Sequence, residues 1–255
     1  MENAWIVTPY FFDQPDPALT EAVPAAQPYL LNAPQAVADR SPAALGLLHR
    51  PIAAFARDAA ARGARPVSVA GDCGASLPVM AGLQQAGLAP VLVWLDAHGD
   101  FNTPQTSPSG FLGGMPLAMM VGRGDPALAR ESSLRPVPEA DVWLIDARDL
   151  DPLEAEAVAG SGLNRSAVWD LPRLAFDRPV HLHIDNDVVD ARDVPANNYP
   201  VPDGPSLDQT CRALAGFKAA NRIAAVSFSG WNGRLKGAGR TARACARLLQ
   251  AALGG

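Results

Sequence analysis

The sequence has little of what marks a secreted, membrane-bound or nucleic-acid-binding protein. Only three of its 255 residues are cysteines, an odd and sparse set that does not make a disulfide framework. The net charge is −5, so no basic surplus exists to neutralise nucleic-acid phosphates or an anionic membrane surface. No apolar run approaches a membrane span, and the first residues lack the pattern of a signal peptide. We therefore expect a cytoplasmic protein whose partner is neither a nucleic acid nor a membrane.

Short apolar segments alternate with segments of helical periodicity. This alternation predicts an α/β fold, a three-layer α/β/α arrangement with a mostly parallel sheet, in one domain over residues 1–255. Ser41 and Ser206 are expected helix N-caps. Residues 11–40 lack periodicity and are expected to form a long, proline-punctuated loop. The predicted strands are 4–9, 66–71, 90–95, 141–146, 167–170, 180–185 and 223–229, and the predicted helices are 42–62, 75–86, 115–122, 152–160, 207–221 and 240–253.

Acidic side chains gather where predicted strands end. Asp96, His98 and Asp100 follow one strand, and Asp185 and Asp187 stand at the end of another. Residues two apart in an extended segment point to the same side, and ligands of open parallel sheets bind at the carboxyl ends of the strands. If the two strands are neighbours, four carboxylates and one imidazole meet in one crevice.

Four ionised carboxylates in one crevice would raise one another's pKa and destabilise the fold, whereas two divalent cations would cancel their charge. Oxygen ligands with one imidazole suit Mn²⁺ or a similar ion, and a pair of bridged ions can activate water. A lone Asp-x-His-x-Asp is often a helix cap or a turn. Two acidic clusters at two strand ends favour the metal site over that interpretation.

At these residues the sequence resembles the arginase/agmatinase family, the ureohydrolases. The resemblance covers about residues 66–235, with the motifs in the family's order and spacing. It implies two divalent metal ions, hydrolysis of the guanidino group of a small amino acid, and assembly into homo-oligomers. The matching segments are GDCGAS (71–76), LDAHGD (95–100), FNTPQTSPSG (101–110), RDLDP (148–152) and HIDNDVVD (183–190).

The resemblance also implies roles for individual residues in the metal centre. Asp96 and Asp185 would bridge the two ions. Asp100 and His98 would be the catalytic residues, with Asp100 orienting the attacking hydroxide. The implied metal ligands are Cys73, Asp96, His98, Asp100, Asp185 and Asp187.

A second set of residues would hold the substrate. Asn102, Thr106 and Ser109 match the loop that binds the α-carboxylate in arginases. Asp151 and Glu154 match the segment that takes the α-ammonium. The chemistry agrees with these roles, because a loop rich in hydroxyl and amide groups suits an anion and a carboxylate suits an amine.

The sequence departs from the family pattern in three places. Cys73 replaces a metal-binding histidine, and a thiolate favours Zn²⁺ or Fe²⁺ over Mn²⁺. The alternative is that Cys73 is a small buried residue beside a single ion. Gly113 replaces the proton-shuttling histidine, and Phe111 replaces a nearby asparagine. No acid stands near Trp231, where arginases hold the guanidinium with a glutamate; Trp231 could stack on it instead or belong to the core.

These departures favour a less basic substrate group. An N-hydroxyguanidine needs a carboxylate partner and a proton donor less than a guanidinium does, and Cys73 matches relatives that hydrolyse N-hydroxyarginine. The products would be urea or hydroxyurea and an ornithine-type amine. Two alternatives remain open: a hydrolase of another amidine or amide, and a non-catalytic relative that binds an amino acid or a metal.

Two histidines precede the acidic end of the strand at 180–185. His183 faces the same way as Asp185 and could support a ligand or Cys73, although a satisfied core histidine is the favoured interpretation. His181 lies deeper in the strand and is expected to be structural.

Overall fold

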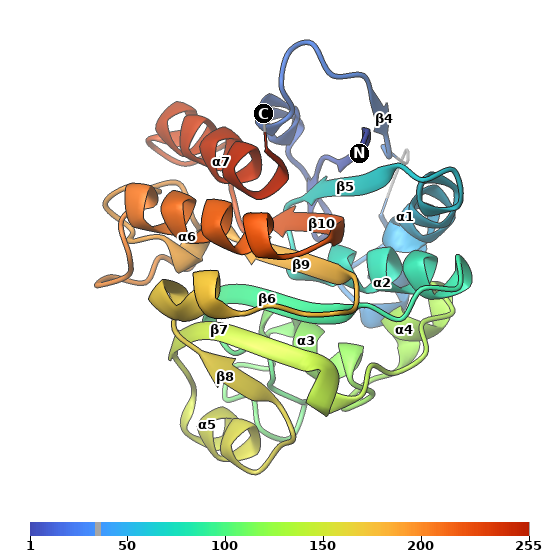
Figure 1. Ribbon diagram of the computed structural model, residues 1–255. Helices are drawn as coiled ribbons and strands as arrows, with labels where there is room; N and C mark the ends of the chain where they lie inside the picture. The colour runs from blue at the N-terminus through green and yellow to red at the C-terminus, as the bar shows by residue number, and fades with distance from the viewer. Residues whose placement is uncertain (34–36, 255) are drawn as a thin grey trace.

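A sheet of eight strands forms the centre of the protein in the computed structural model, which describes residues 1–33 and 37–254 (Figure 1). Its order is β4-β1-β5-β10-β9-β6-β7-β8, and each neighbouring pair is parallel. All carboxyl ends therefore lie at one edge. The strands are β1 (Asn3–Thr8), β4 (Tyr29–Leu31), β5 (Arg65–Ala70), β6 (Val91–His98), β7 (Val142–Asp149), β8 (Asn164–Ser166), β9 (Val180–Asp185) and β10 (Ile223–Ser229), and β2 (Tyr10–Phe11) and β3 (Gln14–Pro15) form a separate hairpin.

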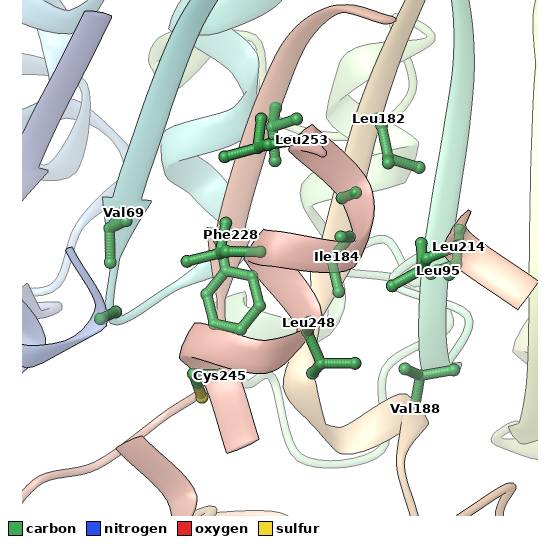
Figure 2. Packing of buried hydrophobic residues seen from close by; sticks show 14 of the residues in the cluster. Val69, Leu95, Leu182, Ile184, Val188, Leu214, Phe228, Cys245, Leu248 and Leu253 are labelled. Carbon is green, nitrogen blue, oxygen red and sulfur yellow. The ribbon is translucent and has the colours of Figure 1, made fainter. Parts of the chain in front are cut away.

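Helices cover both faces of the sheet, which confirms the predicted three-layer fold (Figure 1). The alternation along β6 shows the two faces: Val93 packs with the residues of α6 and α7, whereas Trp94 packs with α1, α2 and α3. Figure 2 shows Leu248 of α7 beside Ile184 of the sheet. The helices are α1 (Pro42–Ala61), α2 (Ser76–Gln85), α3 (Pro116–Met120), α4 (Ala127–Glu131), α5 (Pro152–Ala159), α6 (Leu207–Ala220) and α7 (Ala238–Leu253).

Local sequence signals place the ends of the long helices. The Ser41 hydroxyl accepts a hydrogen bond from the backbone N–H of Ala44, and the Ser206 hydroxyl accepts one from Gln209. Both serines are therefore N-caps, as predicted, because each satisfies a backbone donor that has no partner inside its helix. In the described part of the chain, no helix is both long and apolar enough to cross a bilayer.

Two predictions about local structure are wrong. The segment 167–170 is not a strand: a 3-10 helix, η5 (Val168–Arg173), begins there, and Val168 and Leu171 are buried at helical spacing. The last strand of the sheet is instead the polar segment β8, which pairs with β7. Apolar composition alone did not distinguish the buried side of a short helix from an edge strand.

The predicted loop at 11–40 contains regular structure. A 3-10 helix, η1 (Pro17–Ala22), and the edge strand β4 lie within it, and the β2–β3 hairpin overlaps its start. Within this segment, residues 34–36 lie outside the described residues, as does residue 255 of the predicted domain. β4 pairs with β1 although its side chains are exposed, so it has no alternating pattern for sequence analysis to detect.

Arg148 joins the end of β7 to the loops that follow β9. Its guanidinium forms an ion pair with the Asp146 carboxylate. It also donates to the backbone carbonyls of Asp187, at 3.1 Å, and of Val188 and Val201, at 3.1 and 3.0 Å. One partly buried cation thus holds in place the backbone that presents a predicted metal ligand.

We expect the substitution Arg148→Met to lower the free energy of unfolding by about 3 kcal/mol, because it leaves the Asp146 carboxylate without its partner and several carbonyls without a donor. Equilibrium unfolding in urea would measure this. The matched control is Arg247→Met: Arg247 also pairs with an aspartate, Asp208, but both side chains of that pair are more than half exposed, so its loss should cost much less. Equal effects of the two substitutions would contradict this role of Arg148.

Candidate metal centre and substrate pocket

The carboxyl edge of the sheet brings together six side chains that the sequence predicted as metal ligands. β6 and β9 are neighbouring strands, so their acidic ends meet. The His98 Nδ1 atom lies 3.0 Å from the Asp187 Oδ2 atom and 3.4 Å from the Asp96 Oδ1 atom. On the other side, the Cys73 Sγ atom donates to the Asp185 Oδ2 atom at 3.0 Å. Asp100 completes the group and, like Cys73, lines the cavity above it.

The cavity has a volume of about 320 Å³ and opens above this cluster. Cys73, His98, Asp100, Asp185 and Asp187 form its floor, whereas Asp96 is buried beneath them. Its walls include Phe11, Phe12, Asn102, Ser107, Ser109, Phe111, Asp149, Asp151, Glu154, Asn197, Asn198, Tyr199 and Gly230.

Burial sets the protonation of the acidic cluster. Desolvation, followed by the charge of Asp187, raises the pKa of Asp185 to about 7. Desolvation, followed by Asp96, raises the pKa of Asp187 to about 6. Burial likewise raises the pKa of Asp96 and of the Cys73 thiol. All of these pKa values are raised for the same reason: the fold gathers acidic groups where water cannot solvate their charged forms.

His98 responds in the opposite direction. Burial disfavours its charged form, but hydrogen bonds and charges from Asp187 and Asp96 raise its pKa to about 12. Without a metal ion, protons bound to His98 and to the carboxyl groups thus reduce the negative charge of the cluster. A divalent cation would displace these protons and bind the same donor atoms, because metal ligands must be deprotonated.

The donor set suits divalent cations. Asp100 has φ of 49°, a left-handed conformation that is costly for a non-glycine residue, and its carboxyl group lies close enough to those of Asp96 and Asp185 to interact with their charges. Among residues 1–33 and 37–254, no hydrogen-bond partner reaches its buried Oδ2 atom. Buried polar atoms rarely lack partners, so this atom is available to a cation or to a reacting group.

The predicted substrate-binding loop lies along one wall. Asn102 and Ser109 line the cavity, and the Asn102 Nδ2 atom donates to the Asp151 Oδ2 atom at 3.0 Å. Thr106 lies behind the wall that the described residues form, and its hydroxyl donates to the Asn102 Oδ1 atom at 2.9 Å. Thr106 therefore orients the Asn102 amide rather than facing the cavity.

Glu154 combines a position at the cavity with a structural task. Its Oε1 atom accepts the backbone N–H of Phe101 at 2.8 Å, and its Oε2 atom accepts that of Asp151 at 3.3 Å. Burial raises its pKa, while these two amides oppose the shift. Glu154 thus ties the end of the metal-binding segment to the start of α5.

Phe111 fills the space beside Gly113. A Cβ atom added at Gly113 would lie 2.3 Å from the Phe111 ring, which packs on Phe12 at 5.3 Å and on Tyr199 at 4.9 Å between ring centroids. An apolar, aromatic wall therefore stands where the resemblance to arginases implies a histidine and an asparagine. The residues at positions 111 and 113 are therefore linked, because the Phe111 ring occupies the space that a side chain at position 113 would need.

The end of β10 also excludes a side chain. Gly230 lines the cavity with φ of 91°, and a Cβ atom there would lie 1.8 Å from the Asp185 Oδ1 atom. The neighbouring Trp231 is 1% exposed and packs in the hydrophobic core between the sheet and α7. The prediction that Trp231 stacks on the substrate is therefore wrong. Its ring is buried in the hydrophobic core and does not line the cavity.

Sequence reasoning missed several residues of the cavity wall. Phe11 and Phe12 come from the supposed loop at 11–40, and Asn197 and Tyr199 come from the segment after β9. Asn197 donates to the Asn186 Oδ1 atom at 3.2 Å, which anchors that segment. No periodicity or motif marked these positions; the only signal was that long irregular segments in compact domains are often functional.

Comparison with known proteins identifies the family. The arginase family model matches residues 27–254. Arginase from Bacillus caldovelox is 30% identical over 208 residues, which span 76% of this chain and 70% of that protein. The N(omega)-hydroxy-L-arginine amidinohydrolase of Streptomyces lavendulae is 33% identical over 174 residues, which span 65% of this chain and 60% of that protein.

Solved structures show the same fold. The native structure of arginase from Bacillus caldovelox has a TM-score of 0.86 at 24% identity and covers 100% of this chain and 98% of its own. Formimidoylglutamase from Bacillus subtilis has a TM-score of 0.73 at 16% identity and covers 99% of this chain and 86% of its own. The family match and the sequence relatives also confirm the predicted enzyme class: the chain belongs to the arginase family, and it is a hydrolase of C–N bonds in linear amidines.

Proposed function

We propose that the protein is a metal-dependent amidinohydrolase that cleaves the guanidino group of a small amino acid, with N-hydroxyarginine favoured over arginine. The products would be hydroxyurea or urea and an ornithine-type amine. The convergence of Cys73, His98 and the buried carboxylates on the floor of one cavity carries this proposal. The protein's location in the cytoplasm and its assembly into homo-oligomers remain predictions.

The floor would hold two divalent ions. Asp96 and Asp185 would bridge them, Cys73 and Asp100 would complete one site, and His98 and Asp187 the other. The expected ion is Mn²⁺, with Zn²⁺ or Fe²⁺ as alternatives because a thiolate is soft. When bound, the two ions would supply a water of lowered pKa and positive charge beside the reacting carbon.

The protein's own groups would orient the reaction. The Asp100 carboxylate would accept a hydrogen bond from the attacking water and then its proton, since Asp100 is part of the floor of the cavity. That proton is needed by the departing amine. His98, held between two carboxylates, keeps its ring fixed on the opposite side of the cluster.

The polar wall suits the amino-acid end of the substrate. One Asn102 amide hydrogen is used by Asp151, which leaves the second for an α-carboxylate. The Ser107 and Ser109 hydroxyls can donate to the same group. The Asp151 carboxylate, beside them, is the expected partner of the α-ammonium.

The opposite wall favours a weakly basic reacting group. At Gly113 the aromatic wall leaves no room for a proton-shuttling side chain, and at Gly230 the Asp185 carboxylate leaves no room for an acid. A guanidinium would therefore meet neither partner that arginases provide. The similarity to the Streptomyces lavendulae N(omega)-hydroxy-L-arginine amidinohydrolase supports the less basic substrate.

We expect protein purified without chelator to contain two metal ions per chain and to release hydroxyurea from N-hydroxyarginine faster than urea from arginine. Elemental analysis and the two product assays measure this. Asp100→Asn should reduce kcat by about 10²-fold or more, because it removes the proton acceptor. Fast turnover of arginine but not of N-hydroxyarginine would overturn the substrate preference. One metal or none, without turnover after Mn²⁺ loading, would favour a binding protein.

We also expect that a histidine at position 113 functions only if Phe111 is reduced in size. Gly113→His alone would clash with the Phe111 ring and lower activity on both substrates. In the Phe111→Asn background, the same histidine should raise kcat on arginine by about 10²-fold or more over Phe111→Asn alone, since general acid–base help is typically worth that much. Steady-state kinetics of the three variants measure the effect. Equal activity on arginine in Phe111→Asn and in the double variant would contradict the proposed link between the two positions.

A further inference from the structure

A network of buried polar side chains lies beneath the cavity, on the side of Cys73. His183, on β9, and Ser227 and Ser229, on β10, are its centre, and all three are buried. The proposed function gives His183 no role. A buried imidazole with ordered partners this close to a metal cluster therefore calls for a physical reason.

His183 has a ring nitrogen within reach of two of the proposed ligands. This nitrogen, the Cys73 Sγ atom and an Asp96 carboxylate oxygen all lie within 4.8 Å of one another. Ligand atoms lie about 2.0–2.3 Å from a zinc ion, so two ligands of one ion are separated by roughly 3–4.5 Å. A single cation can therefore contact all three side chains after small adjustments.

The hydrogen bonds of His183 leave one of its two ring nitrogens available to a cation. Its Nδ1 atom lies 2.9 Å from the Ser227 hydroxyl, whereas its Nε2 atom has only a long contact, 3.4 Å, to the Ser229 hydroxyl. If Nδ1–H donates to Ser227, the lone pair of Nε2 is free to bind a metal. Metal-binding histidines are commonly fixed by such a hydrogen bond from their other nitrogen.

Trp94 fixes the ring from the neighbouring strand. Its indole stacks on the His183 imidazole with 3.7 Å between ring centroids, and its Nε1–H donates to the Asp96 Oδ2 atom at 3.2 Å. The same side chain therefore orients the imidazole and one of the carboxylates. A metal site requires such rigid support of the side chains that bind the ion.

We propose that His183 is a ligand of the ion on the Cys73 side of the cluster, an inference that rests on the proposed metal-dependent function. Cys73 and His183 with Asp96 supply sulfur, nitrogen and oxygen atoms to one ion. That set favours Zn²⁺ over Mn²⁺, because thiolate and imidazole are softer donors than carboxylates. The other ion, near His98 and Asp187, keeps a donor set suited to Mn²⁺.

Cobalt(II) reports on these ligands directly. In the Co²⁺-loaded full-length protein, we expect a thiolate-to-cobalt charge-transfer band from Cys73. Proton NMR in H₂O should show two strongly shifted, exchangeable imidazole N–H signals, one from His98 and one from His183. His183→Gln should remove one signal and keep the charge-transfer band, whereas Cys73→Ser should remove the band.

His181→Gln is the matched control. His181 is buried on the same strand and contacts the same Ser227 hydroxyl at 2.9 Å, but it is not part of the metal-ligating group. This variant should keep both N–H signals. Two signals retained in His183→Gln would overturn the proposal.

The wild-type protein alone decides the question if His183→Gln does not fold. Two shifted N–H signals are expected, and a single signal in protein that binds two Co²⁺ ions would overturn the role of His183. If the wild-type protein binds no Co²⁺, the proposed metal-dependent function fails instead. The two failures are therefore distinguishable.

Discussion

The burial of four carboxylates at one edge of the sheet is the constraint around which the rest of the structure is arranged. Asp96 and Asp185 come from adjacent parallel strands, so their approach follows from the topology itself. Without compensation, burial raises the pKa of each, and the ionised cluster opposes folding. Divalent cations would remove this penalty and would also supply catalytic power, so the acidic cluster that destabilises the metal-free protein would serve the proposed reaction.

The surroundings of the cluster hold it in place without adding charge to it. Backbone amides donate to its carboxylates: the N–H of His98 to Asp96 at 2.7 Å, and the N–H of Ala97 to Asp187 at 3.1 Å. The nearby cation, Arg148, binds carbonyls behind the loop instead of a ligand carboxylate. An arginine or lysine bound to these carboxylates would compete with a metal ion, whereas backbone amides, and a guanidinium that binds only the neighbouring carbonyls, fix the geometry and leave the carboxylates available.

The sequence was informative wherever the physics is local or periodic. The strand–helix alternation predicted the layers, the serine caps predicted helix starts, and the spacing of Asp96, His98 and Asp100 predicted a convergent cluster. The edge strand β4 and the aromatic wall were not predictable in this way. β4 exposes its side chains, so it carries no pattern, and Phe12 reaches Phe111 only because the fold brings together segments about a hundred residues apart.

At two of the departures from the family pattern, a neighbouring side chain occupies the space that the family's residue would need. The Phe111 ring closes the space beside Gly113, and Asp185 closes the space beside Gly230. Neither glycine can simply be replaced by the family residue, because each is matched by a neighbour. An enzyme that had merely lost its function would not need this matching. A cavity that keeps its acidic floor and its polar wall, yet has no room for the partners of a guanidinium, supports the proposal of a weakly basic reacting group.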